Sequence, residues 1–231
     1  MRQPSPQTDA VTDPETDARA HWDEIYRTKR ATSSGQPSRI LARIAATLPP
    51  GRALDLGSSN GDDVIWLAAQ GWQALGLDIS PVACDRAAAR TATLELSGSA
   101  RFYACDLALG LPDDLPDDPP HRQFDLVTAL FFQSQLPLPR ARILAEAARR
   151  VAPGGHFLLV SHAQPPGTAG EKAAAKGQIF PTLDEERAAI AADPQGWITR
   201  EARQQDRMGK DPEGAPMQLR DNLLWLERRR G

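Results

Sequence analysis

A short apolar segment that runs into a glycine-rich loop limits the folds open to this chain more than any other feature. Residues 53–56 read Ala-Leu-Asp-Leu, and residues 57–61 read Gly-Ser-Ser-Asn-Gly. A brief apolar run bounded by turn residues is typical of a strand buried on both faces, as in a parallel sheet. Gly57 lets the chain leave that strand in a turn that residues with a Cβ atom resist. A helical pattern of apolar residues follows at 62–70, so the segment predicts a strand–loop–helix unit.

The same alternation continues along the chain and predicts the fold class. Further strands are expected at 74–78, 101–105, 124–132 and 156–160, and further helices at 80–94, 138–151 and 183–192. Strands that alternate with helices form right-handed crossovers, which give an α/β fold with a mostly parallel sheet and helices on both faces. We expect a tight turn at 153–155 and, after the last helix, an antiparallel pair at 198–207 and 217–227.

The amino-terminal part is expected to lie outside this alternation. Residues 1–15 are polar and rich in proline, which predicts a disordered tail. Residues 16–231 predict a single domain, in which 16–48 form amino-terminal helices. Trp22 and Tyr26 lie at helical spacing, and the pattern leaves open whether they pack in the core or form a lid over a binding site.

The binding site is expected beyond the carboxyl ends of the strands, where ligands bind in open α/β sheets. Gly61 opens a helix whose first N–H groups lack partners within the helix, and its missing side chain lets a ligand approach closely. Asp78 ends the second strand about 20 residues later, where a carboxylate can accept hydrogen bonds from both ribose hydroxyls. A glycine-rich turn before a helix is common without any ligand, but Asp78 at this spacing favours a nucleoside site.

The residues around the loop bear on which nucleoside it would bind. The dinucleotide pattern Gly-x-Gly-x-x-Gly, placed on Gly57, requires glycine where the chain has Ser59 and Asp62. The adjacent acids Asp62 and Asp63 would also repel a pyrophosphate. S-adenosylmethionine has no phosphate, and its sulfonium and ammonium groups favour nearby acids. The loop therefore favours S-adenosylmethionine, and the missing glycines oppose a nicotinamide oxidoreductase.

Four stretches together resemble the class I S-adenosylmethionine-dependent methyltransferases. Residues 53–61 resemble the first motif of that family, 75–80 the segment after it, 124–127 the fourth-strand motif and 151–157 the turn into the fifth strand. They keep the family's order and spacing and cover most of residues 50–161. The resemblance implies a Rossmann-like, doubly wound sheet of seven strands in the order three-two-one-four-five-seven-six, with an antiparallel last strand.

The resemblance also implies a cofactor site and its product, S-adenosylhomocysteine. The implied site consists of Asp55, Gly57, Ser58, Ser59, Asn60, Gly61, Asp78, Ile79, Asp106, Leu107 and Gln133. Asp55 and Gly57 are expected beneath the methionine part, Asp78 on the ribose and Ile79 against the adenine. Ser58 and the residue after it depart from the family, which usually has a glycine in the middle of this loop.

Three further positions complete the implied site. Asp106 is expected to accept from the adenine amino group, although an aspartate at a strand end also caps turns. The Leu107 N–H is expected to meet a nitrogen of the adenine ring, and Gln133 is expected near the transferred methyl group.

Methyl transfer from a sulfonium is an in-line displacement, so the protein has chiefly to align the two reactants and exclude water. A general base helps when the acceptor is a hydroxyl or a thiol. His162, at the carboxyl end of the fifth strand, is the best-placed candidate, with an exposed loop histidine as the alternative. His156 is expected at the other end of that strand, away from the site.

The acceptor is expected to be a small molecule. The stretch 22–26, the Gly196-Trp197 turn and the final hairpin resemble the branch with tellurite-resistance and thiopurine methyltransferases, which implies a thiol or chalcogen nucleophile. The histidine–arginine pair of the tellurite-type proteins has no clear counterpart here. A non-catalytic module that binds S-adenosylmethionine or S-adenosylhomocysteine is the alternative function, suggested by the altered loop and the lack of an obvious base.

Charge and composition bear on partners and location. The formal net charge of −3 gives no electrostatic reason to expect nucleic acid or an anionic membrane. No apolar run approaches the roughly 20 residues that span a bilayer, so a cytoplasmic protein is expected. Cys84 and Cys105 form neither a Cys-x-x-Cys pair nor a Cys/His cluster, and no metal site is expected. The sequence does not predict an oligomeric state.

Overall fold

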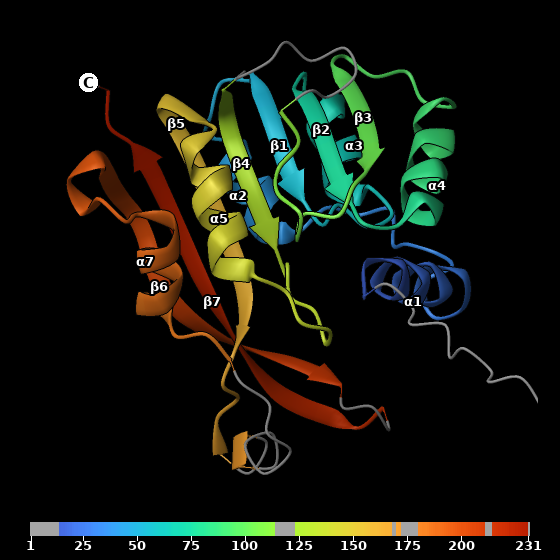
Figure 1. Ribbon diagram of the computed structural model, residues 1–231. Coiled ribbons are helices and arrows are strands. Elements are labelled where there is room, and N and C mark those ends of the chain that lie inside the picture. The colour runs from blue at the N-terminus through green and yellow to red at the C-terminus, as the bar shows by residue number, and fades with distance from the viewer. Residues whose placement is uncertain (1–13, 114–122, 168–169, 172–179, 211–213, 231) are drawn as a thin grey trace, which may run out of the picture.

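A seven-stranded sheet forms the centre of the structure, a computed structural model that describes residues 14–113, 123–167, 170–171, 180–210 and 214–230 (Figure 1). The strands are Arg52–Leu56 (β1), Gln73–Asp78 (β2), Ser99–Ala104 (β3), Phe124–Leu130 (β4), Val151–Ala163 (β5), Trp197–Lys210 (β6) and Pro216–Arg228 (β7). Their order across the sheet is β3-β2-β1-β4-β5-β7-β6. Strands β1 to β5 pair in parallel, whereas β7 is antiparallel to β5 and β6. The predicted Rossmann-like sheet and its strand order are therefore confirmed.

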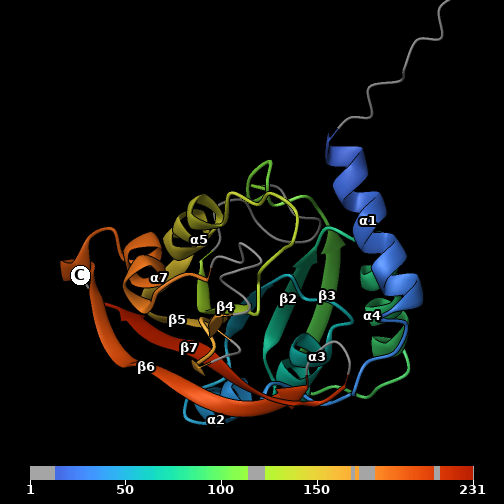
Figure 2. The same cartoon turned by 90° about the horizontal axis from the view of Figure 1, so that it is seen from below.

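Helices cover both faces of the sheet. The helices are Pro14–Thr28 (α1), Arg39–Ala45 (α2), Asp62–Ala69 (α3), Pro81–Thr91 (α4), Arg140–Arg149 (α5) and Leu183–Ile190 (α7), and a short 3₁₀ helix, Pro194–Gly196 (η1), precedes β6. Helices α2 and α3 lie on one face, and α5 and α7 on the other (Figure 2). Helix α4 packs against β2 and β3, and α1 packs against α4 beyond the carboxyl ends of the strands.

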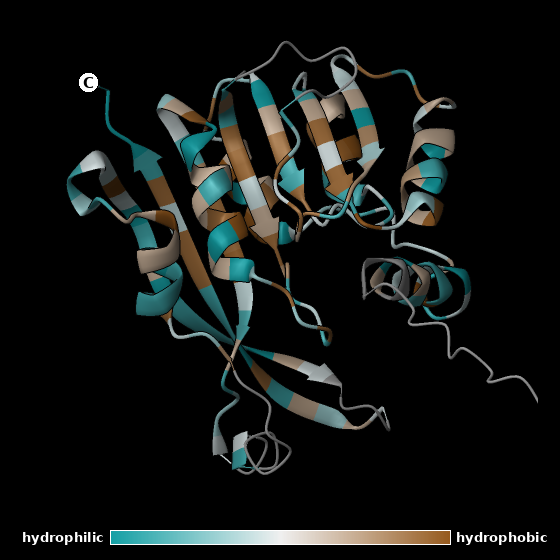
Figure 3. Cartoon of the chain, viewed as in Figure 1, coloured by the Kyte–Doolittle hydropathy of each residue, from teal (hydrophilic) through white to brown (hydrophobic). Residues whose placement is uncertain are grey.

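Each face of the sheet has its own hydrophobic core, because successive side chains of a strand point to opposite faces. In β5, Phe157 and Leu159 join the core beneath α5 and α7, while Leu158 and Val160 join the core beneath α2 and α3. All four side chains are fully buried. The central strands accordingly carry most of the hydrophobic colour in Figure 3.

Local sequence signals explain where the helices of the crossovers begin. The Ser80 side chain accepts a hydrogen bond from the Ala83 N–H at 3.2 Å, and Pro81 occupies the first turn of α4. Serine is a preferred cap, and proline fits the first helical position because the N–H it lacks would have no partner there. This start of α4 lies where the sequence predicts it.

Strand β5 begins earlier than expected, and the predicted turn at 153–155 is wrong. Val151 already pairs with Phe124, and the register shifts between Phe124 and Leu126. A Cβ atom on Gly155 would lie 2.9 Å from the Phe124 carbonyl oxygen. The glycines thus let the strand continue through an irregular pairing instead of reversing the chain.

Some expectations fall outside the described residues. Residues 1–13 of the expected tail are not described, and Pro14 and Glu15 already belong to α1. The predicted carboxyl-terminal hairpin is present as β6 and β7, although its turn at 211–213 is not described. This hairpin continues beyond the carboxyl ends of β4 and β5. Helix α1 also lies beyond the carboxyl ends of the parallel strands (Figure 1).

Candidate functional site

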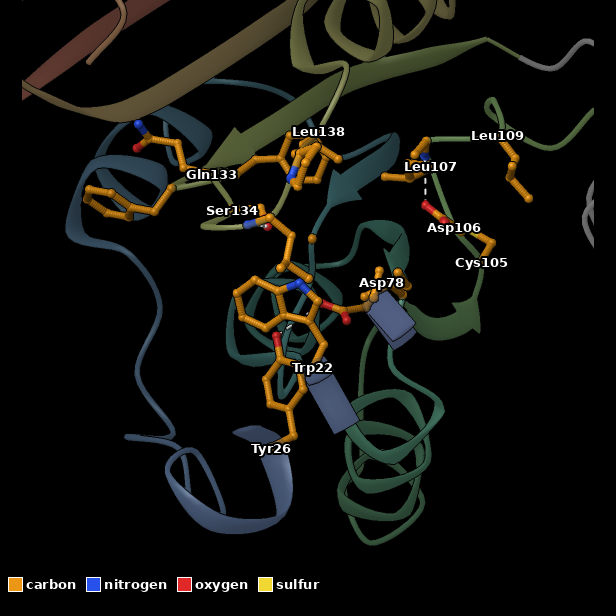
Figure 4. Close-up of a pocket in the computed structure, with 18 of the residues that line it drawn as sticks. Trp22, Tyr26, Asp78, Cys105, Asp106, Leu107, Leu109, Gln133, Ser134 and Leu138 are labelled. Carbon is orange, nitrogen blue, oxygen red and sulfur yellow. Dashed lines mark hydrogen bonds between the residues drawn. The ribbon is translucent and has the colours of Figure 1, made fainter. Parts of the chain in front are cut away.

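A cavity of about 390 Å³ opens beyond the carboxyl ends of the parallel strands. Its walls come from α1, from the ends of β1 and β2, and from the segments after β3 and β4 (Figure 4). Six of the residues that the sequence predicts for the site line it: Gly57, Asp78, Ile79, Asp106, Leu107 and Gln133. The other six, which are Asp55, Ser58, Ser59, Asn60, Gly61 and His162, do not line it.

The glycine-rich loop after β1 is held in its turn by left-handed residues. Gly57 and Gly61 have φ values of 69° and 81°, and Ser59 has a φ of 53°. A Cβ atom on Gly61 would lie 2.7 Å from the Phe102 ring and 2.8 Å from the Ala87 Cβ. The missing side chain at Gly61 therefore allows α4 and β3 to pack closely, rather than making room for a ligand as the sequence suggests.

Ser59 takes a left-handed conformation although its side chain has a Cβ atom. A left-handed residue with a Cβ atom costs roughly 1–2 kcal/mol. The Ser59 N–H donates to the Asp78 Oδ2 at 2.9 Å, and this bond to a carboxylate helps to offset the cost. The loop thus holds a left-handed residue at position 59 without a glycine there.

Asp78 is buried and accepts three hydrogen bonds at the floor of the cavity. Ser80 N–H donates to Oδ1 at 2.9 Å, while Ser59 N–H and the Tyr26 hydroxyl donate to Oδ2 at 2.9 and 3.2 Å. Burial raises the pKa of Asp78 above its usual value, and the donated hydrogen bonds oppose that rise. A carboxylate has about four acceptor positions, so one position on Oδ1 is open to a further donor.

Two more acids lie near the loop. Asp55 is buried and accepts from the Thr128 hydroxyl at 2.6 Å. Burial and then the neighbouring Asp63 carboxylate raise the pKa of Asp55 well above its usual value. Burial raises the pKa of Asp63 to about 6, although its carboxylate accepts from the Ser38 N–H at 2.6 Å. These acids would favour a cation bound near the carboxyl end of β1.

Helix α1 contributes the aromatic residues Trp22 and Tyr26 to one wall of the cavity. Trp22 and Tyr26 both line the cavity, and Figure 4 shows them facing Asp78. The Arg86 guanidinium donates to the carbonyl oxygens of Tyr26 and Arg30, at 3.2 and 3.1 Å. Asn60 donates to the same Arg30 carbonyl oxygen at 3.0 Å. The end of α1 is thereby fastened to α4 and to the glycine-rich loop.

The segment after β3 forms the opposite wall. The Asp106 carboxylate accepts from the Ala108 N–H at 2.8 Å, so it does cap a turn while it lines the cavity. Leu107 is buried, and within the described part of the chain its N–H has no hydrogen-bond partner. This wall therefore presents a carboxylate and an N–H group beside apolar side chains, among them Leu109 and Leu138.

The segment after β4 connects the cavity to His162. The Gln133 side chain forms two hydrogen bonds with the His162 backbone, accepting from its N–H at 2.7 Å and donating to its carbonyl oxygen at 3.4 Å. The His162 ring lies against Phe131, with ring centroids 4.6 Å apart. Phe131 and Gln133 line the cavity, so His162 stands directly behind its rim. His156 lies at the other end of β5, where the Trp225 indole donates to it.

Several cavity residues carry no recognisable sequence signal. Phe131, Phe132, Ser134, Leu136, Pro137 and Leu138, which follow β4, line the cavity. Phe131 has a left-handed φ of 54°, which a propensity argument does not anticipate. Among the described residues, no group of three or more His, Cys, Asp or Glu side chains is arranged to hold a metal ion.

Comparison with known proteins agrees with this geometry. Residues 54–157 match the methyltransferase domain family. This part of the chain is therefore similar to a methyltransferase domain. The matched residues contain the glycine-rich loop and Asp78 at the end of β2.

Individual relatives extend the match. A 27-O-demethylrifamycin SV methyltransferase of Amycolatopsis mediterranei is 31% identical over 161 residues, covering 68% of this chain and 54% of that protein. A probable thiol methyltransferase 2 of Arabidopsis thaliana is 30% identical over 129 residues, covering 54% of each chain. The chain thus spans about half the length of these curated relatives.

A solved structure shares the fold over nearly the whole chain. The magnesium protoporphyrin IX methyltransferase of Synechocystis, solved with bound SAM, has a TM-score of 0.63 and 18% sequence identity. The similarity covers 96% of this chain and 100% of that one. Among the described helices, none combines the length and hydrophobicity needed to span a bilayer.

Proposed function

We propose that this chain is an S-adenosylmethionine-dependent methyltransferase that methylates a small molecule, a thiol or a chalcogen nucleophile. The observation that carries the proposal is the buried Asp78 carboxylate at the floor of a 390 Å³ cavity, beside the glycine-rich loop. Cavities of about 300–1,000 Å³ suit small ligands, and an acid at the end of the second strand suits a ribose.

The residues that line the cavity fit such a cofactor. Asp78 would accept from the ribose hydroxyls, and Ile79 and Leu107 would enclose the adenine between apolar surfaces. The Asp106 carboxylate and the Leu107 N–H offer an acceptor and a donor for the edge of the base. When bound, S-adenosylmethionine supplies a methyl group that its sulfonium already activates.

The acids beneath the loop would hold the charged end of the cofactor. Asp55 lies at the carboxyl end of β1, and Asp63 lies in the first turn of α3. Gly57 would pass close beneath the methionine part, and Gln133 would stand near the transferred methyl group. The loop residues Ser58, Ser59, Asn60 and Gly61 would act by shaping this end of the site.

The acceptor class rests on the small cavity and on resemblance. Helix α1 would act as a lid over the cavity, whose volume of about 390 Å³ suits small ligands, and the matched plant relative is a probable thiol methyltransferase. A location in the cytoplasm and the absence of nucleic-acid or membrane partners are part of the same proposal.

Calorimetric titration with S-adenosylhomocysteine tests the cofactor assignment. We expect micromolar binding to the wild-type chain and a loss of about 100-fold or more in Asp78→Ala, because hydrogen bonds to a charged group are each worth about 1.5–3 kcal/mol. Asp85→Ala, on the exposed side of α4, is the matched control and should bind as wild type does. No binding to the wild-type chain would refute the cofactor assignment.

A panel of acceptors tests the substrate class. 2-Mercaptoethanol, selenite and phenol are each incubated with the chain and S-adenosylmethionine, and methylated product is measured by mass spectrometry. We expect product from the thiol or from selenite. Product from phenol alone would refute a thiol or chalcogen acceptor while leaving the methyltransferase assignment intact.

A further inference from the structure

Four side chains from four strands meet behind the rim of the cavity. His162 of β5, Asp221 of β7, Arg207 of β6 and Phe131 at the end of β4 form this rim cluster. The His162 Nδ1 and the Asp221 Oδ1 are 3.1 Å apart, and the Arg207 Nε donates to the Asp221 Oδ2 at 2.6 Å. The Arg207 guanidinium also lies over the Phe131 ring, 5.7 Å from its centroid.

Asp221 orients the imidazole. Its carboxylate is only 1% exposed, and burial alone would raise its pKa, but hydrogen bonds from His162 and Arg207 hold the pKa below its usual value. Asp221 is therefore ionised at neutral pH and fixes the proton of a neutral imidazole on Nδ1. In the part of the chain that the structure describes, Nε2 has no hydrogen-bond partner, so it remains free to accept a proton.

The imidazole is half-exposed and held at the cavity rim from two sides. The His162 side chain is 44% exposed. The Gln133 side chain forms two hydrogen bonds with the His162 backbone, and the Phe131 ring packs against the imidazole ring. Phe131 takes this position at the cost of a left-handed backbone. Such strain in a residue with a Cβ atom persists only where the surrounding structure demands it, and it is concentrated at functional sites.

We propose that His162 is the general base of the reaction and that the rim cluster is the acceptor site, with a protonated thiol as its substrate. The proposal rests on the proposed function. The Nε2 of His162 takes the S–H proton, the sulfur lone pair forms the new bond to the methyl carbon, and the electron pair of the broken sulfonium bond remains on the departing sulfur. The products are a methyl thioether, neutral S-adenosylhomocysteine and a protonated His162, which returns its proton to water.

The cluster also explains why a thiol would be accepted in this place. The Arg207 guanidinium, already paired with Asp221, adds positive charge beside the sulfur as the thiolate develops. Phe131 is 39% exposed and would offer apolar surface to the carbon side of the acceptor. Asp221 from β7 and Arg207 from β6 are the charged groups that the described residues place against the imidazole, while the end of β4 contributes the uncharged Phe131 and Gln133.

Two thiols that differ in acidity test this proposal. 4-Nitrothiophenol is ionised at pH 7.5 and needs no base, whereas 2-mercaptoethanol is almost wholly protonated. We expect His162→Gln to lower kcat/KM about 100-fold for 2-mercaptoethanol and less than threefold for 4-nitrothiophenol, since general bases contribute roughly 10²–10⁴ in rate.

Controls separate this role from a structural one. His156→Gln makes the same replacement at the other end of β5 and should change either rate less than twofold. Asp221→Asn, a change in a positioning residue, should also slow 2-mercaptoethanol selectively; its melting temperature is measured alongside, because Asp221 is buried.

The outcomes also distinguish the two proposals. Equal losses for both thiols in His162→Gln, or no loss for either, would overturn the role of His162 while the methyltransferase assignment stands. A wild-type chain that binds S-adenosylhomocysteine but methylates neither thiol would overturn the acceptor site. A wild-type chain that does not bind S-adenosylhomocysteine would overturn the proposed function itself.

Discussion

Replacing Asp63 with asparagine measures what this partly buried acid near the glycine-rich loop costs the folded chain. Burial raises the pKa of Asp63 from 3.8 to about 6. Since one pKa unit is worth about 1.4 kcal/mol, an ionised Asp63 at pH 7 disfavours the folded state by about 3 kcal/mol. The first turn of α3 offsets about 0.3–1 kcal/mol of this cost, because helix amino termini favour negative charge.

Asparagine removes the charge and keeps the acceptor. Its side-chain amide oxygen can still accept from the Ser38 N–H, which lies 2.6 Å from the Asp63 Oδ1 in the wild-type chain. We therefore expect Asp63→Asn to raise the free energy of unfolding by about 1–2 kcal/mol at pH 7. Asp63→Ala loses the acceptor as well, and an unpaired donor costs about 1–3 kcal/mol, so alanine should be less stable than asparagine.

The stability difference between Asp63→Asn and the wild-type chain should depend on pH. A carboxyl group whose folded pKa is raised binds its proton more tightly in the folded state, so it destabilises the fold as the pH rises from 3.8 toward 6. About half of the gain in Asp63→Asn should therefore be lost at pH 5, and the full gain should be present above pH 7. Equilibrium urea unfolding of both chains at pH 5, 6, 7 and 8 measures this difference.

Two results would refute the reasoning. One is an asparagine variant that is less stable than wild type at pH 7. The other is a difference in unfolding free energy that is the same at pH 5 and at pH 8, because a charge effect on this carboxyl group cannot be independent of pH in that range.

Three further substitutions test packing and pairing at named contacts. Gly61→Ala should lower the unfolding free energy in urea by about 2–4 kcal/mol, since the new Cβ atom would meet a ring at 2.7 Å in a left-handed backbone. Arg140→Ala should lower the unfolding free energy by about 3 kcal/mol, because Glu186 is 1% exposed and would lose the cation that it pairs with. Arg142→Ala on the same helix is the control and should lower it by under about 1 kcal/mol, because the Arg142 ion pair is more exposed. Tyr26→Phe should tighten S-adenosylhomocysteine binding about three- to tenfold by calorimetry, because it frees an acceptor position on Asp78; weaker binding would contradict that competition.

The parts of the site that could be predicted from sequence are those carried by one strand and its following loop. Gly57 and Asp78 each end a strand of recognisable pattern, and parallel strands bring their carboxyl ends to one edge. Asp106 follows from the same argument applied to β3. The turn predicted at 153–155 fails because a glycine pair permits either a reversal or an irregular strand, and pairing with β4 decides between them.

The role of Gly61 shows a second limit of local reasoning. A glycine before a helix is compatible with a bound ligand and with close packing. Only the positions of Phe102 and Ala87, which come from later elements, show that packing requires it.

The order of apolar and polar residues was enough to determine the alternating elements, the parallel sheet and the edge at which a ligand would bind, because those depend on side-chain period and on the handedness of short connections. The tertiary structure alone decided which distant residues meet at that edge. Tyr26 reaches Asp78 across 52 positions of sequence, and His162 meets Asp221 across 59. Such contacts depend on how α1 and the β6–β7 hairpin fold back over the carboxyl ends of the strands, and no periodicity within either segment encodes the partner it will find.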